Sequence, residues 1–60
     1  MRLLTIYEVA EYLKVSSQMI RNLIKERILS FYYVGRLIRI DEKDVEDYLN
    51  MRRIKKRITK

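Results

Sequence analysis

The chain has only 60 residues and contains neither cysteine nor histidine, and this combination constrains its fold more than any other feature. A domain of this size buries about 60% of the surface that its unfolded chain exposes, so its core is small. Many domains of this length are stabilised by disulfides or by a zinc ion bound to Cys and His. Both are excluded here, so a single domain has to be held together by the packing of its own side chains.

The same two absences bear on function. Without histidine the chain lacks the usual general base, which excludes Ser-His and Cys-His catalysis. We expect no enzyme activity, no metal site and no cofactor. The lack of cysteine fits a cytoplasmic protein, and no segment has the length and hydrophobicity of a signal peptide or a membrane span. Hydrophobic residues make up 48% of the chain and charged residues 37%, which predicts a folded protein.

The net charge of +6 is unevenly placed along the chain. Residues 14–39 carry six basic side chains and one acidic one, and residues 52–60 carry six basic side chains and no acid. Residues 40–51 instead hold five acids and one lysine. Basic residues that only keep a domain soluble are the alternative interpretation, but two basic zones separated from the acids favour a polyanionic partner.

Two helices are predicted in the first half of the chain. Thr5 and Glu8 have the spacing of a capping box, and apolar residues recur at helical spacing after it, at Ile6, Val9, Ala10 and Leu13. This predicts a helix over about residues 6–13. After a short turn at residues 14 and 15, Ser16 is the next N-cap candidate. A second helix is expected from about residue 17 to about residue 27.

The second helix has one apolar side and one side without acids. At 100° per residue, Ile20, Leu23 and Ile24 share the buried side, together with Arg27. The opposite side carries two carboxamides and two cations: Gln18, Arg21, Asn22 and Lys25. These are the groups that bond base edges and phosphates. An ordinary solvent-exposed face explains the pattern equally well when the helix is considered alone.

A β-hairpin is predicted next. Two β-rich runs, residues 29–34 and 37–40, flank Gly35-Arg36, a pair typical of a type II′ turn. This register pairs Val34 with Leu37, Tyr33 with Ile38, Tyr32 with Arg39 and Phe31 with Ile40. One face is then apolar or aromatic throughout and is expected in the core: Leu29, Phe31, Tyr33, Ile38 and Ile40. Arg36 lies at the tip.

A third helix is expected to begin after Asp41. Acidic residues fill its first turn, where the helix dipole favours them, and Val45, Tyr48 and Leu49 supply its apolar side. Capping therefore explains the acidic cluster without a catalytic role. The apolar spacing continues through Met51, Ile54 and Ile58, so residues 52–60 are either a basic amphipathic extension of this helix or a disordered basic arm.

The order helix, helix, hairpin, helix is that of a winged helix-turn-helix, an α+β fold. The chain resembles the excisionase-type DNA-binding domains, relatives of the MerR-type regulators, over about residues 3–50. The resemblance is carried by the segments Leu4-Thr5-Ile6-Tyr7-Glu8-Val9-Ala10-Glu11-Tyr12-Leu13-Lys14-Val15-Ser16, Ile20-Arg21-Asn22-Leu23-Ile24-Lys25-Glu26, Val34-Gly35-Arg36-Leu37-Ile38-Arg39-Ile40 and Asp44-Val45-Glu46-Asp47-Tyr48-Leu49. We therefore expect a DNA-binding domain over residues 1–51 and a basic tail over residues 52–60.

The chain departs from the family pattern at three positions. Arg27 stands where the family usually has glycine, Ser30 where it often has proline, and Met19 where it usually has threonine. Without this glycine the sequence does not decide where the second helix ends, because the left-handed residue that follows a helix is least strained as glycine. The missing threonine removes one expected phosphate contact.

The resemblance implies that the second helix enters the major groove and that the hairpin touches the backbone or the minor groove. The resemblance and the outward side of the second helix together indicate eight DNA-binding residues: Ser16, Ser17, Gln18, Arg21, Asn22, Lys25, Arg36 and Arg39. The two serines and the helix N-terminus face phosphate, Gln18 and Asn22 face base edges, and Lys25 faces phosphate. Arg21 is left open between guanine and phosphate. Tyr7 and Tyr12 are interpreted as half-buried spacers without a function.

The expected function is sequence-specific binding of double-stranded DNA, as an excisionase-like factor that sets the direction of recombination. A small MerR-like transcriptional regulator and the DNA-binding part of a plasmid-maintenance protein are the alternatives, and a protein adaptor is a third class. One module buries about 600–1,000 Å² on DNA, little for high specificity. We therefore expect cooperative self-association on DNA, or a recombinase or other protein bound through the tail. No membrane partner is expected, and the protein is placed with the nucleoid.

Overall fold

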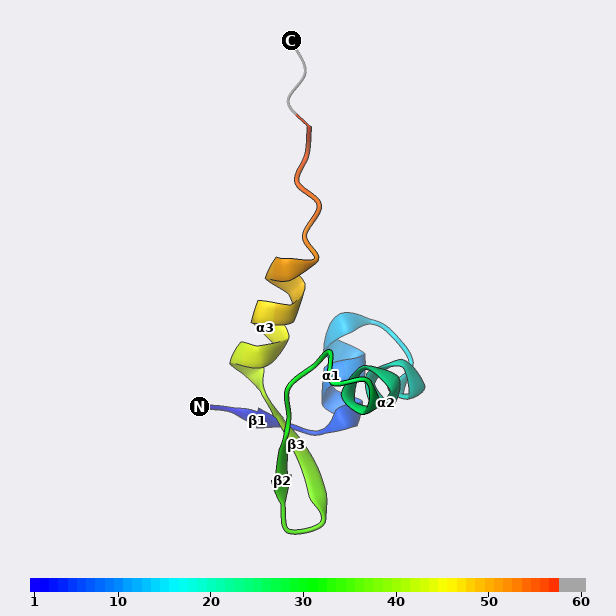
Figure 1. Ribbon diagram of the computed structural model, residues 1–60, viewed down its shortest axis with the longest axis vertical. Coiled ribbons are helices and arrows are strands. Elements are labelled where there is room, and N and C mark those ends of the chain that lie inside the picture. Colours follow the sequence, from blue (N-terminus) through cyan, green and yellow to red (C-terminus); the bar gives the residue numbers. More distant parts are fainter. Residues whose placement is uncertain (58–60) are drawn as a thin grey trace.

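The computed structural model describes residues 1–57. Its elements are β1 (Leu3–Leu4), α1 (Ile6–Leu13), α2 (Ser17–Lys25), β2 (Tyr32–Val34), β3 (Leu37–Asp41) and α3 (Glu42–Met51). Figure 1 shows α1 and α2 on one side of the sheet, the β2–β3 hairpin projecting away from them, and α3 leading to the opposite end of the molecule. This is a small winged helix-turn-helix, as the sequence predicts.

Both predicted helix starts are confirmed by their caps. The Oγ1 atom of Thr5 accepts a hydrogen bond of 3.0 Å from the backbone N–H of Glu8, and the Glu8 carboxylate accepts one of 2.8 Å from the backbone N–H of Thr5. The Oγ atom of Ser16 accepts a bond of 3.2 Å from the backbone N–H of Met19. These bonds satisfy N–H groups that the first turn of a helix leaves free.

The expectation that the second helix reaches residue 27 is wrong, since α2 ends at Lys25. Arg27 takes a left-handed φ of 61°. The backbone N–H of Ile28 then donates to the carbonyl oxygen of Leu23 at 2.9 Å, and that of Arg27 to Ile24 at 3.0 Å. This pair of bonds is a Schellman motif, which normally uses glycine at the left-handed position. Arg27 is therefore not on the buried side of the helix but exposed beyond its end.

The helix α1 ends in the same way. Lys14 has φ 59°, and the backbone N–H of Val15 donates to the carbonyl oxygen of Ala10 at 3.0 Å. Such a turn reverses the chain sharply within two residues. It brings α2 back beside α1, so the short connection between the helices follows from a cationic residue held in a glycine-like conformation.

The sheet has an additional strand that the sequence does not predict. Its order is β1-β3-β2, with antiparallel neighbours, and Leu4 of β1 lies opposite Ile40 of β3. The backbone N–H of Glu42 also donates to the carbonyl oxygen of Arg2 at 2.9 Å. The start of the chain is therefore joined to the connection between β3 and α3.

The hairpin register is confirmed for three pairs: Tyr32 with Arg39, Tyr33 with Ile38 and Val34 with Leu37. Gly35 has φ 64°, whereas Arg36 is not among the residues with positive φ, as a type II′ turn requires. The expected pair of Phe31 with Ile40 is not formed, because β2 begins at Tyr32. The hairpin, or wing, thus extends beyond the core as a narrow ribbon.

The core is a single cluster of apolar side chains from all three helices, β1, β3 and the loop before β2. Its fully buried or nearly buried members are Leu4, Val9, Ala10, Ile20, Ile24, Leu29, Ile40 and Val45. Phe31 and Ile38 are half-buried against it. The expectation that Tyr33 is a core residue is wrong, since 69% of it is exposed. Tyr33 lies on the part of the ribbon that extends past the helices, where no element covers that face.

The third helix begins as expected, with the Asp41 side chain accepting a bond of 3.0 Å from the backbone N–H of Lys43. Val45 is buried and Tyr48 half-buried, but Leu49 is 41% exposed. The described part of the tail does not continue the helix, because residues 53–57 form neither helix nor strand and are exposed. Ile58 lies outside the described residues.

Candidate nucleic-acid interface

The outer face of α2 is polar and open to solvent. Gln18, Arg21, Asn22 and Lys25 are all exposed, as their helical angles predict. The amide nitrogen of Gln18 donates to the side-chain oxygen of Asn22 at 3.1 Å. This bond fixes the two carboxamides relative to each other and leaves the oxygen of Gln18 and the nitrogen of Asn22 available. Together these offer an acceptor and a donor, the combination that an adenine edge requires.

The two serines at the start of α2 differ in their surroundings. The Ser16 oxygen is already the N-cap acceptor, so only its O–H remains to donate to a ligand. Ser17 is half-buried in the first turn of the helix. Both stay beside the free N–H groups of the helix N-terminus, where an anion is favoured.

Arg21 is held by Tyr7, a contact the sequence does not predict. Its Nη2 atom donates to the Tyr7 hydroxyl at 3.0 Å, and the guanidinium carbon lies 5.3 Å from the centre of the tyrosine ring. Tyr7 is 64% exposed and Tyr12 is 51% exposed, so Tyr7 is more exposed than expected, whereas Tyr12 is about half-buried. Tyr7 and Arg21 lie 14 positions apart, so no local pattern could have paired them.

The wing brings two more cations toward α2. Arg36 is exposed at the hairpin tip, and Arg39 is half-buried, with its Nη1 atom donating to the carbonyl oxygen of Ile38 at 2.7 Å. A shallow groove of about 430 Å³ connects the start of α1, the middle of α2 and the wing. Its lining residues are Thr5, Ile6, Tyr7, Arg21, Arg36, Leu37, Ile38 and Arg39.

This groove is basic and is not neutralised from within. None of its eight lining residues is acidic, and three are arginines. In the part of the chain that the structure describes, one side-chain ion pair is present, between Arg2 and Glu42 at 3.3 Å. The cations of α2 and the wing are therefore not in a side-chain ion pair within residues 1–57. Gln18, Asn22 and Lys25 do not line the groove but lie beside it on the same helix.

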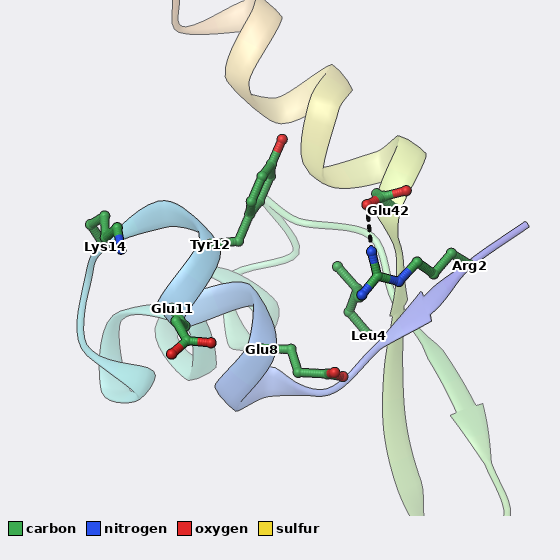
Figure 2. A pocket seen from close by; sticks show the side chains of 7 residues that line it. All are labelled: Arg2, Leu4, Glu8, Glu11, Tyr12, Lys14 and Glu42. Carbon is green, nitrogen blue, oxygen red and sulfur yellow. Dashed lines mark hydrogen bonds and ion pairs between the residues drawn. The ribbon is translucent and has the colours of Figure 1, made fainter.

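The acidic residues do not line this groove, although the Glu8 carboxylate is close enough to Arg39 for the two charges to interact. A second hollow is lined by Arg2, Leu4, Glu8, Glu11, Tyr12, Lys14 and Glu42 (Figure 2). The bond from the Thr5 backbone N–H lowers the pKa of Glu8 below its ordinary value, so this carboxylate is held charged by its capping role. Over residues 1–57, no group of three or more acidic side chains has the arrangement of a metal site.

The described part of the tail extends from α3, away from the wing (Figure 1). The guanidinium of Arg52 lies 4.5 Å from the centre of the Tyr48 ring, whereas Arg53, Lys55, Lys56 and Arg57 are exposed without regular structure. The molecule therefore has basic groups at two ends. Within residues 1–57 no helix is long and apolar enough to cross a membrane.

Comparison with known proteins identifies the domain. Over 49 residues, 80% of the chain, it is 51% identical to YvgK, an uncharacterized protein of Bacillus subtilis (strain 168), and it spans 16% of that relative's length. No solved structure matches the chain. The model of the helix-turn-helix domain family matches residues 3–53, from β1 to just beyond α3. The chain thus belongs to the family of helix-turn-helix domains, whose members are DNA-binding modules.

Proposed function

We propose that this domain binds double-stranded DNA sequence-specifically, with α2 in the major groove and the wing on the backbone or in the adjacent minor groove. The observation that carries the proposal is the acid-free groove in which Arg21 of α2 meets Arg36 and Arg39 of the wing. A helix and a hairpin that present cations to one hollow fit the sugar-phosphate backbone beside a DNA groove, because this backbone is convex and carries one negative charge per phosphate.

The side chains have different roles in this proposal. Gln18 and Asn22 read base edges, since their carboxamides are already fixed relative to each other. Lys25, Ser17 and the Ser16 O–H bind phosphates on one side of α2. Arg36 enters the minor groove or contacts its backbone, where narrow A-tracts concentrate negative potential. Arg39, anchored by its bond to the Ile38 carbonyl oxygen, supports it with a second positive charge.

The biological role proposed is that of an excisionase-like factor in site-specific recombination. The helix-turn-helix family matched here includes excisionase-like domains. Residues 1–51 would bind DNA. The basic tail from residue 52 would contact a recombinase or bind further DNA phosphates with its positive charges. Cooperative binding of neighbouring copies would compensate for the small contact area of one module.

A second role is favoured by one observation. In YvgK the matching segment is only 16% of the protein, so in that relative the domain is one part of a longer chain. A MerR-like transcriptional regulator or a plasmid-maintenance protein is consistent with such an arrangement. An excision assay with purified integrase and supercoiled plasmid separates the two roles, because only an excision factor changes the yield of excised circles.

The binding proposal is tested by footprinting and fluorescence titration over several salt concentrations. If about six phosphates are neutralised, the slope of log affinity against log salt concentration is about −5. Arg36→Ala should make this slope less negative by about 0.9. Lys43→Ala is the matched control, because Lys43 is exposed at the start of α3 and its loss removes the same charge. Affinity that is independent of salt, or an equal effect of both substitutions, would contradict the proposal.

A further inference from the structure

The contact between Tyr7 and Arg21 indicates which residues of the interface contact the DNA backbone and which contact the bases. We propose that the side chains of Tyr7 and Arg21 together bind one DNA backbone phosphate in the groove between α2 and the wing, so that Arg21 contacts the backbone and not a base. The inference rests on the proposed function, and it assigns a binding role to Tyr7.

The geometry of the pair gives it the right donors. The Tyr7 hydroxyl accepts the Arg21 Nη2 bond at 3.0 Å, so its own proton remains free to donate. A guanidinium has five N–H donors, and the bond to Tyr7 uses one of them. The pair can therefore offer an anion a neutral O–H and a charged N–H fork at the same time. Phosphate oxygens accept both kinds of bond.

The position of the pair favours phosphate over base. Arg21 lies about 60° from Gln18 and about 100° from Asn22 around the axis of α2. It is therefore at the edge of the outer face, and Tyr7 draws its guanidinium toward the start of α1. There it shares the groove with Arg36 and Arg39 and with no carboxylate. A helix in the major groove places its central face on the bases and its edges near the two backbones, which leaves the bases to Gln18 and Asn22.

The ring of Tyr7 also organises Arg21 before DNA binds. The guanidinium carbon lies 5.3 Å from the ring centre, within the range of a cation–π interaction. A side chain held in its binding conformation loses less conformational freedom on complex formation. Tyr7 is thus both a ligand and a positioning residue. Removal of its hydroxyl and removal of its ring should have separate effects.

The experiment compares Tyr7→Phe, Tyr7→Ala and Arg21→Ala on cognate and scrambled duplexes. The Tyr7 hydroxyl would donate to a charged phosphate oxygen, and loss of such a bond predicts that Tyr7→Phe weakens both duplexes about ten- to a hundredfold with an unchanged salt slope. Arg21→Ala should weaken both by a larger and equal factor and make the slope less negative by about 0.9. Tyr12→Phe is the matched control: it changes a tyrosine of the same helix that lines the other hollow (Figure 2), and it should have no effect.

A modified duplex locates the phosphate directly. When single phosphates are replaced in turn by neutral methylphosphonates, the wild-type protein should lose affinity at one position. At that position Tyr7→Phe should lose less affinity than the wild type, and Arg21→Ala should lose the least. The proposal is overturned if Arg21→Ala changes the base preference at one position of the site. It is also overturned if Tyr7→Phe binds like the wild type.

The free protein distinguishes failure of this inference from failure of the proposed function. In NMR spectra without DNA, the Arg21 side-chain protons should show an upfield ring-current shift that Tyr7→Ala abolishes. Salt-dependent DNA binding without the effects of Tyr7 would refute the phosphate pair alone. Absence of DNA binding with the ring-current shift intact would refute the DNA-binding function, and the phosphate role with it.

Discussion

The backbone N–H of Ile28 donates to the carbonyl oxygen of Leu23 at 2.9 Å, closing α2 with a turn through Arg27. Arg27 holds φ 61° in this turn, although the left-handed region costs a non-glycine residue about 1–2 kcal/mol. Its guanidinium lies 5.6 Å from the centre of the Phe31 ring, an interaction of about 0.5–1 kcal/mol at an exposed site. The ring contact therefore offsets part of the backbone strain.

Substitutions at Arg27 test this balance. Arg27→Gly removes the strain, but it also removes the ring contact and makes the unfolded chain more flexible, so we expect the free energy of unfolding to change by less than about 0.5 kcal/mol. Arg27→Val keeps the strain, adds a branched side chain and loses the ring contact, which should destabilise by about 1–2 kcal/mol. Urea unfolding measures both. Equal stability of the two variants would contradict the account.

The core depends on Ile20, which is fully buried at the centre of α2. Ile20→Val should lower the free energy of unfolding by about 0.5–1.5 kcal/mol and Ile20→Ala by about 2–5 kcal/mol. In so small a domain the alanine variant should be substantially unfolded at 37 °C by circular dichroism. Met19→Ala changes a neighbouring residue that is 43% exposed, and it should have a much smaller effect.

Ser16 separates a capping role from a DNA-binding role. Because its Oγ atom accepts from the Met19 N–H, Ser16→Ala should lower stability by about 1 kcal/mol. Ser16→Asp preserves the N-cap but places a negative charge beside the proposed phosphate site. It should therefore keep thermal stability and weaken DNA binding. A variant that melts like the wild type and binds DNA normally would remove Ser16 from the interface.

Glu8 predicts a pH dependence of stability. The Thr5 backbone N–H lowers the pKa of Glu8 from its ordinary value of 4.5 in the folded protein. The charged Glu8 carboxylate therefore stabilises the folded protein at pH values above its pKa in the unfolded chain. This stabilisation is lost as the pH falls through the pKa of Glu8 in the folded protein. Glu8→Gln should be less stable than the wild type at neutral pH, and the difference should disappear in acid.

Because Asp44 also titrates in acid, the stability of Glu8→Gln has to be compared with that of the wild type at each pH. Burial, followed by the charges of Asp41 and Asp47, raises the pKa of Asp44 above its ordinary value of 3.8. The folded protein therefore takes up that proton more readily than the unfolded chain, and the slope of stability against pH has the opposite sign. Urea midpoints of wild type and Glu8→Gln between about pH 6 and about pH 3 isolate the Glu8 contribution. A constant difference over this range would contradict it.

The tail can be removed without disturbing the contact of Arg52 with Tyr48. A chain that ends at Arg52 lacks Arg53, Lys55, Lys56, Arg57 and Lys60. If the tail binds DNA, this chain should show a salt slope less negative by up to about 4.5, with unchanged base preference. If the tail binds a recombinase, DNA affinity should stay the same and excision should fail. Gel-shift titration and the excision assay distinguish these outcomes.

Local sequence patterns predicted the parts of the fold that depend on local bonds. The Thr5 and Ser16 caps, the Gly35 turn and the Asp41 cap each use residues within three positions of one another, and all are confirmed. The outward face of α2 was predictable for the same reason, since helical angles depend only on spacing.

The errors arise where distant parts of the chain meet or fail to meet. β1 has only two residues, too few for an alternating pattern, and it exists because Ile40 offers it a partner. Tyr33 has the alternation of a core residue, but the helices do not reach that far along the wing. The Tyr7–Arg21 contact requires α1 and α2 to be packed first. The end of α2 is a local exception, because it depends on whether Arg27 can adopt a glycine-like φ.

The bond between Arg2 and Glu42, together with the pairing of Leu4 with Ile40, has a consequence for the order of folding. Residues 2–4 acquire their neighbours only when the segment near position 42 is in place. Neither the helical half nor the hairpin has a complete interior until then. The domain should consequently acquire protease resistance in one step and not half by half.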